Sequence, residues 1–187
     1  FDFYHRLGSL LAILYSLETV DVFFENLMAC GANPVVVDLE TLFHPTLDTA
    51  SIESASDLVK TTINRSVMAV GILPQPTLSD NGNKTFDISG IGASVDQQAP
   101  YNVSGIINFG RDDIQISKIP GWISSAHNRP DDDDSRPIPA QHILDGFSES
   151  YDLLQKKKDT LLSNDGPLEC FKKCRSRLIV RNTIRYG

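Results

Sequence analysis

The sequence lacks the features that define several large classes of protein. No run of about 18 consecutive apolar residues occurs among its 187 residues, so we expect no membrane-spanning helix. It has three cysteines, an odd number that favours a reducing compartment over a disulfide framework. Its histidines, His5, His44, His127 and His142, are scattered, so no Cys–His zinc site is expected.

An excess of acidic side chains argues against nucleic acid as a partner, since the formal net charge is −7. The charge is unevenly distributed. Residues 1–150 carry 8 basic and 20 acidic side chains, a balance of −12, whereas residues 151–187 carry 9 and 4, a balance of +5. A basic C-terminal segment on an acidic body could meet an anion such as phosphate. For Lys156–Lys158 we favour a solvated helix face, and for Asp131–Asp134 a solvated loop.

Hydrophobic periodicity predicts the main elements of one globular domain. Apolar residues recur at helical spacing in residues 3–19 and 140–163, and residues 44–65 are expected to be partly helical. Residues 76–139 are rich in Gly, Pro, Asn, Asp and Ser, a composition typical of a functional flap, an activation-type loop or disorder. We therefore predict an α+β fold that is mostly helical, with short β-hairpins and long irregular loops.

A β-hairpin is predicted within the stretch DVFFENLMACGANPVVVDLETLF. Two apolar runs, Leu27–Cys30 and Val35–Val37, are joined by a turn over residues 31–34. A polar residue, Asn26, precedes the first run, and Asp38 follows the second. Because a hairpin reverses the chain, we expect Asp38 to approach Asn26.

Phosphoryl transfer requires a carboxylate that orients the attacking hydroxyl and accepts its proton, together with oxygen ligands for Mg²⁺ on the nucleotide phosphates. Protein kinases supply these groups from a loop with Asp-x4-Asn spacing and a later Asp. Asp21 and Asn26 have this spacing, and Asp38 follows twelve residues later. From spacing alone, a structural interpretation is favoured, with Asp21 as a cap, Asn26 as a turn former and Asp38 as a helix N-cap.

The same stretch resembles the dehydratase domain of class II lanthipeptide synthetases, the LanM family. That family has an Asp-x-His-x-Glu-Asn loop, a turn, and an apolar strand that ends in Asp-Leu-Glu-Thr-Leu-Phe. Further segments resemble the same domain in the same order, so the resemblance covers most of the chain: YHRLGSLLAILYSL, SVMAVGILP, DISG, ILDGFSESY and RLIVRNTIRY.

The resemblance implies a lipid-kinase-like or protein-kinase-like catalytic lobe in a cytoplasmic bacterial enzyme. Residues 1–187 would form part of the dehydratase domain, without the N-terminal nucleotide lobe and the C-terminal cyclase domain, and would be inactive in isolation. The implied reaction phosphorylates Ser and Thr of a lanthipeptide precursor peptide, leader plus core, with ATP and Mg²⁺. It then eliminates phosphate to give dehydroalanine or dehydrobutyrine.

The resemblance also implies roles for individual residues. Asp21 would be the catalytic carboxylate, and Asn26 and Asp38 would hold Mg²⁺ on the nucleotide. Arg177 and Thr183 match the elimination pair of the family, and an arginine fork beside a hydroxyl can stabilise a departing phosphate. From the residues alone, a basic edge strand is the favoured interpretation of the segment RLIVRNT.

One residue departs from the family pattern. Phe23 stands where the family has histidine, and a phenyl ring cannot form the hydrogen bonds of an imidazole. Two interpretations follow: the loop repacks and retains activity, or the phosphorylation step is impaired. The second makes the chain a kinase-like module that binds a peptide or partner. A generic small-molecule kinase is a weaker alternative, because simple phosphotransfer does not need an elimination pair.

Overall fold

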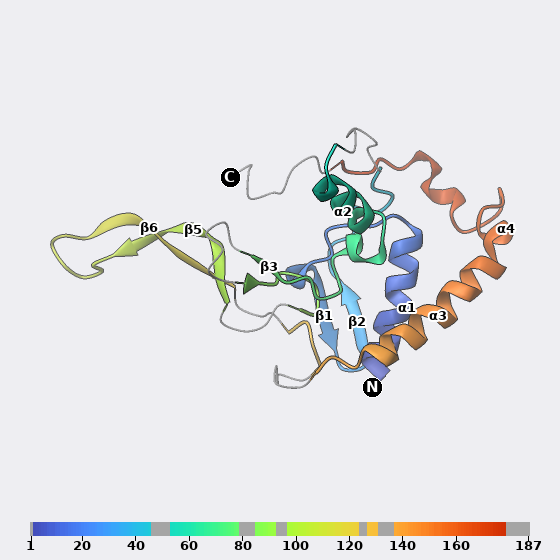
Figure 1. The fold of residues 1–187 in the computed structure, drawn as a ribbon, viewed down its shortest axis with the longest axis horizontal. Coiled ribbons are helices and arrows are strands. Elements are labelled where there is room, and N and C mark those ends of the chain that lie inside the picture. The colour runs from blue at the N-terminus through green and yellow to red at the C-terminus, as the bar shows by residue number, and fades with distance from the viewer. Residues whose placement is uncertain are drawn as a thin grey trace.

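The computed structural model describes residues 2–45, 53–78, 85–92, 97–123, 127–130 and 137–178. Over these residues the fold is α+β, with two long helices, several short ones and three antiparallel sheets of two strands each. Figure 1 shows a body built around the helices and a long hairpin that projects from it. Within the described ranges, the helices are all too short or too polar to cross a membrane.

Helices α1 (Asp2–Ser16) and α3 (Ala140–Lys156) pack side by side, although they lie at opposite ends of the sequence (Figure 1). Glycines allow this close approach. A Cβ atom added to Gly8 would overlap the carbonyl oxygen of Ile143, and one added to Gly146 would overlap that of His5. The two backbones therefore touch at this crossing, which fixes the position of α3 on α1.

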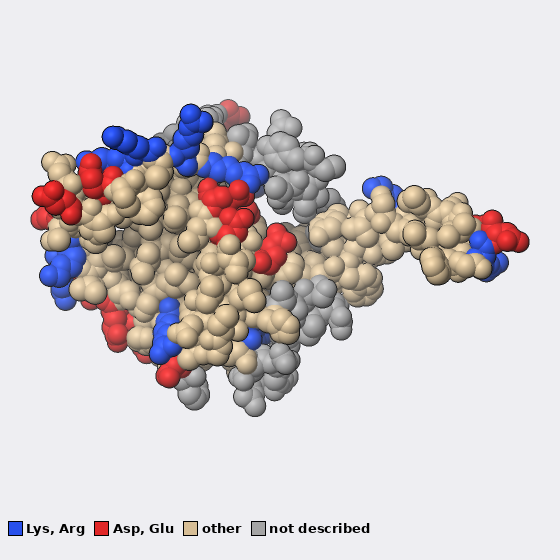
Figure 2. Space-filling view, turned by 180° about the vertical axis from the view of Figure 1, so that it is seen from behind, with Lys and Arg blue, Asp and Glu red and all other residues tan. Residues whose placement is uncertain are grey.

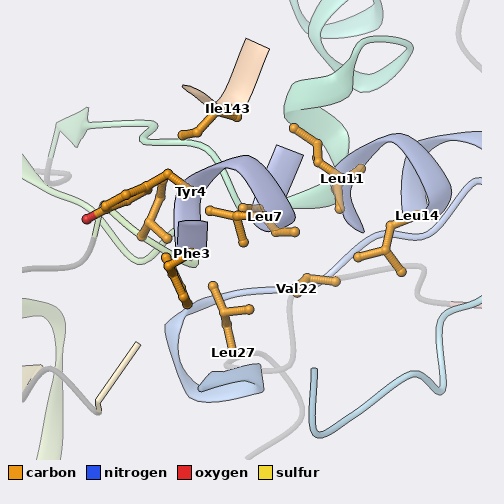
Figure 3. Packing of buried hydrophobic residues seen from close by; sticks show 11 residues of the cluster. Phe3, Tyr4, Leu7, Leu11, Leu14, Val22, Leu27 and Ile143 are labelled. Carbon is orange, nitrogen blue, oxygen red and sulfur yellow. The ribbon is translucent and has the colours of Figure 1, made fainter. Parts of the chain in front are cut away.

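The hydrophobic core forms between α1 and the segments that follow it in the chain (Figure 3). Helical spacing places a stripe of side chains on one face of α1, and burial of each leucine stabilises the fold by about 1.5–3 kcal/mol. The core comprises Phe3, Tyr4, Leu7, Leu11 and Leu14 of α1, Val22, Leu27, Val70, Ile72 and Ile91 of the loops and short elements, and Ile143 of α3.

The predicted hairpin is confirmed as β1 (Leu27–Cys30) and β2 (Asn33–Val36), with Leu27 opposite Val36. Its turn is shorter than expected, because Asn33 and Pro34 already belong to β2. The turn consists of Gly31 and Ala32, and Gly31 has a φ of +59°, a conformation that favours glycine. The fully buried Leu27 anchors the hairpin to the core.

The region after the hairpin contains α2 (Ala55–Asn64), which agrees with the prediction of partial helix over residues 44–65. Ser54 caps this helix: its hydroxyl accepts from the Asp57 N–H, and the Asp57 carboxylate accepts from the Ser54 N–H. The segment SVMAVGILP forms the 3₁₀ turn η2 (Val67–Val70), which ends at Gly71. Gly71 has a φ of +90°, so it closes the turn at low steric cost.

The prediction of an irregular stretch over residues 76–139 was wrong for much of its length. After a small sheet of β3 (Thr77–Leu78) and β4 (Thr85–Phe86), the strands β5 (Gln97–Ile107) and β6 (Gln115–Ile123) form one long antiparallel hairpin, here called the β5–β6 arm. Its two strands contain Val and Ile residues, which are enriched in β-strands. The Gly, Pro and Asn residues between them concealed this pattern.

One face of the β5–β6 arm is exposed. Along β6 the even-numbered side chains point outward: Ile116 is 78% exposed and Trp122 is 66% exposed. Ile116 pairs across the hairpin with Ile106, which is also exposed. The odd-numbered residues lie on the other face, where Ile119 covers Gly105. Figure 2 shows charged side chains gathered at the far end of the arm and sparse along its length.

The chain after α3 continues through α4 (Lys158–Leu161) and the 3₁₀ helix η3 (Glu169–Lys173). The structure describes this segment as far as Leu178. Most of the strand predicted over residues 177–183, including Thr183, lies outside the described residues, as does the acidic run Asp131–Asp134.

Candidate functional site

Asp21 lies in a loop that leads from α1 to the β1–β2 hairpin. Its φ of +66° is uncommon for a residue other than glycine, although aspartate tolerates this region better than most. Two hydrogen bonds fix the loop on either side: the Val22 N–H donates to the Val70 carbonyl over 2.9 Å, and the Asn26 carboxamide donates to the Asp21 carbonyl over 2.9 Å. Asn26 therefore helps to shape the backbone that presents Asp21.

The hairpin brings Asn26 and the start of the Asp38 segment together through the backbone. The Val37 N–H donates to the Asn26 carbonyl over 3.0 Å, which extends the β1–β2 ladder beyond its ends. Asp38 follows directly, and its Oδ1 accepts from the Glu40 N–H over 2.9 Å. This bond is an Asx turn, so Asp38 has a local structural role that differs from the helix N-cap considered from the sequence.

The electrostatics of the site centre on Asp21. Partial burial raises the pKa of its carboxyl group above the ordinary value, and the negative charges of Glu25, Glu40 and Asp38 add to that rise. The positive charge of Arg177 acts in the opposite direction. Asp21 is thus a half-buried carboxylate among other acids with one nearby guanidinium. Such perturbed groups are typical of functional sites.

Arg177 reaches this acidic group through Glu40. Its guanidinium donates a hydrogen bond to the Glu40 carboxylate, and this bond, together with the charge of Glu40, raises the pKa of Arg177. Both side chains are about half exposed, and an exposed ion pair stabilises a fold by only about 0–1 kcal/mol. The pair therefore contributes little to stability, but it shows that the C-terminal segment lies close to the Asp21 loop.

Sequence reasoning did not single out Glu40. The available signal was the motif DLETLF itself, in which Glu40 stands two residues after Asp38. A charged residue this close in sequence to a proposed metal ligand could have been considered as a further site residue. Its partner Arg177 could not be read from the motif, because the two residues are 137 positions apart.

The ring of Phe23 packs against the polypeptide backbone. A Cβ atom added to Gly71 would lie 3.3 Å from Cδ1 and Cε1 of this ring, so the ring covers the end of η2. The backbone of Phe23 bridges to Ser89, and the neighbouring Phe24 N–H donates to the Ile88 carbonyl over 3.1 Å. The phenyl ring of Phe23 therefore packs between the Asp21 loop and the end of η2.

Among the described residues, no group of three or more His, Cys, Asp or Glu side chains could hold a metal ion without other ligands. This is compatible with Mg²⁺, which proteins commonly hold through one or two side-chain oxygens while substrate phosphates and water complete the shell. Asn26 and Asp38 carry oxygen ligands of the required type. By donor type they fit the one or two side-chain ligands that the protein would supply. The other predicted site residue, Thr183, lies outside the described residues.

Comparison with known proteins places this chain in a family. The full chain, residues 1–187, matches the family described as "Domain of unknown function (DUF4135)". The chain belongs to the DUF4135 family. It is also 29% identical over 195 residues to the lacticin 481/lactococcin biosynthesis protein LcnDR2 of Lactococcus lactis subsp. lactis. That match covers 100% of the DUF4135 chain and 20% of the relative, so the chain spans about a fifth of the length of the curated relative it matches.

These two matches confirm the resemblance to the LanM family on which the sequence interpretation was based. In this DUF4135 chain, the charges of Glu40, Arg177 and Asp38 act on Asp21, Asn26 donates to the Asp21 carbonyl, and Arg177 pairs directly with Glu40. This arrangement combines a carboxylate of raised pKa, oxygen ligands and a guanidinium. Such a set can orient a hydroxyl, hold a cation and bind a phosphate group.

Proposed function

We propose that this chain is part of the dehydratase of a lanthipeptide synthetase. In this proposal the whole enzyme phosphorylates Ser and Thr residues of a precursor peptide and then eliminates the phosphate. The role of the relative in lacticin 481 biosynthesis supports a peptide-modifying enzyme. The observation that supports the mechanism is that the charges of Arg177 and Asp38 both act on Asp21 and that Arg177 contacts Glu40, as expected if Arg177 binds phosphate near the proposed phosphorylation site.

In the phosphorylation step, Asp21 orients the substrate hydroxyl and accepts its proton. The hydroxyl oxygen forms a bond to the γ-phosphorus of ATP, and the bond between that phosphorus and the oxygen of the departing ADP breaks. A raised pKa makes the Asp21 carboxylate a stronger base than an ordinary aspartate. Asn26 and Asp38 would hold Mg²⁺, which neutralises charge on the ATP phosphates when it is bound.

In the elimination step, water or another base takes the Cα proton of the phosphorylated residue and the Cα=Cβ double bond forms. The Cβ–O bond breaks, and phosphate leaves with its electron pair. A guanidinium has five N–H donors, and the contact of Arg177 with Glu40 uses one of its terminal nitrogens. The remaining donors can bind the departing phosphate, with Thr183 as the second member of the pair. Since Arg177 lies beside the acidic group around Asp21, both steps can take place at one location.

The second candidate is an impaired kinase-like module that binds a peptide or partner, and Phe23 is the residue that motivates it. The packing of Phe23 on Gly71 favours the active alternative, because the ring has a structural role in keeping the Asp21 loop against η2. A loop kept in place by packing retains the groups that the first step needs.

Co-expression of the full-length protein with its precursor peptide tests the proposal. Mass spectrometry of the peptide is expected to show loss of water at Ser and Thr, and the purified enzyme is expected to require both ATP and Mg²⁺. A peptide that remains unmodified, while the protein still binds it, would support the impaired module instead. A phosphorylated small molecule with no change in the peptide would support a generic kinase.

A further inference from the structure

Two side-chain contacts connect the segment 169–178 to the segment 38–44. The second segment begins with Asp38, a proposed Mg²⁺ ligand. One is the ion pair between Arg177 and Glu40. The other is an aromatic pair: the rings of Phe171 and Phe43 lie 5.3 Å apart between centroids, at an angle of 54°. Of these two contacts, only that of Arg177 involves a residue to which the elimination step above gives a role.

The segment that carries Arg177 gains little from burial. Residues 170–178 are all exposed, and η3 ends where the Cys174 N–H donates to the Phe171 carbonyl over 2.9 Å. Beyond that point the chain is extended through Cys174 and reaches Arg177 three residues later. Because a solvated ion pair holds a long side chain weakly, the aromatic contact matters for where this segment lies.

The partner ring is presented by an unusual backbone conformation. Phe43 has a φ of +56°, which is a genuine outlier for a bulky residue. Hydrogen bonds on both sides maintain it: the Phe43 N–H donates to the Leu17 carbonyl over 2.9 Å, and the His44 N–H donates to the Glu18 carbonyl over 3.2 Å. Backbone strain that the surroundings enforce in this way is concentrated at functional sites.

We propose that the Phe43–Phe171 ring pair is a positioning device that holds Arg177 beside Asp21 for phosphate elimination. The inference rests on the proposed dehydratase function and extends it to two residues that need not touch the substrate. Phe171 docks η3 onto Phe43, and the short extended segment after η3 then delivers the guanidinium to Glu40. Phe43 and Phe171 are positioning residues, since each acts through Arg177.

The test uses the full-length protein and its precursor peptide and measures the two steps separately. In Phe171→Ala, elimination is expected to slow by about 3- to 10-fold, so that phosphopeptide accumulates. Phosphorylation, followed by ADP release, is expected to stay within about twofold, because Asp21, Asn26 and Asp38 are untouched. Phe171→Tyr keeps the ring and is expected to restore elimination. Leu162→Ala, an exposed apolar residue before η3, is the matched control and is expected to leave both steps unchanged.

A double variant shows whether Phe171 acts through Arg177. If it does, Phe171→Ala is expected to slow elimination no further when Arg177 is already replaced by alanine. An equal additional loss in that background, or an equal loss of both steps in the single variant, would overturn the positioning role in favour of a general structural one. If Arg177→Ala itself eliminates phosphate normally, the proposed role of Arg177 in elimination fails, and this inference fails with it. If Arg177→Ala accumulates phosphopeptide and Phe171→Ala does not, this inference alone fails.

Discussion

The guanidinium of Arg177 pairs with the carboxylate of Glu40 across 137 positions of sequence, and both charges act on Asp21. If Arg177 binds the departing phosphate, its removal should affect elimination and spare phosphorylation. We expect Arg177→Ala to slow elimination by about 10²- to 10³-fold, so that phosphopeptide accumulates in mass spectra.

Arg177→Lys is the informative partner of that variant. Lysine keeps the charge and loses the planar fork, so elimination should recover only in part. Arg175→Ala removes a neighbouring exposed charge and serves as the control for net charge. Complete dehydration by Arg177→Ala would show that another group binds the phosphate.

Asp21 is expected to reduce the stability of the fold at neutral pH. Because its native pKa is raised, the native state binds the proton more tightly than the unfolded chain does. The stabilisation from this group is present in full below the unfolded pKa of about 3.8 and is lost as the pH rises through the native value. Asp21→Asn removes this penalty, and asparagine also accepts a φ of +66°.

Asp21→Asn should therefore unfold at higher denaturant concentration than the parent protein at pH 7, with the difference shrinking as the pH falls toward the unfolded pKa of about 3.8. The same variant should lose phosphorylation. Asp152→Asn, an exposed position on α3, should leave stability and activity as they were. A variant that is less stable at pH 7 would mean that the charged carboxylate stabilises the fold.

Phe23→His restores the residue type of the LanM loop at a position where the present ring packs on Gly71. The imidazole is smaller and polar, so the loop should be modestly less stable, by about 1 kcal/mol. If the histidine orients Asp21 or contacts phosphate, phosphorylation of the precursor peptide should become faster. The measurement is the rate of ADP release by the two proteins. Equal rates would show that the loop with Phe23 already supports phosphorylation.

Gly8 lies where α1 and α3 meet backbone to backbone. Gly8→Ala should destabilise the protein by about 1–3 kcal/mol or more, because the new methyl group overlaps the Ile143 carbonyl and forces the helices apart. Gly31→Ala is the control: the site is open but has a positive φ, so only a backbone cost of about 1–2 kcal/mol is expected. Urea denaturation curves of both variants separate steric overlap from conformational strain.

The presence of the long helices could be predicted from the sequence, because local hydrophobic periodicity determines it. The residues at which the helices end were predicted less well. The helix expected over residues 3–19 ends at Ser16, because Glu18 takes a φ of +51° and the Thr19 N–H turns back to the Leu14 carbonyl. Glycine usually occupies that left-handed position, and a glutamate gives no stop signal. The β5–β6 arm was missed for a related reason, since its strands are stabilised by each other and not by local composition.

For the candidate site too, local features could be predicted from the sequence, and contacts between distant segments could not. The two apolar runs between Asn26 and Asp38, with a turn between them, predicted a hairpin. The backbone pairing of Asn26 with Val37 is what such a local pattern can predict. The contacts of Glu40 with Arg177 and of Phe43 with Phe171 bring together segments more than a hundred positions apart. No pattern in either segment identifies its partner, so these contacts became visible only in the folded chain.

The crossing of α1 and α3 has a consequence for how such domains can change over time. It closes the intervening chain, including the β5–β6 arm, into one loop whose two ends are fixed by helix contact. Doubling the length of a flexible loop costs only about 0.6 kcal/mol, so insertions and deletions in the arm are compatible with an unchanged body. Related proteins can therefore acquire arms of different length and surface while the Asp21 loop keeps its geometry.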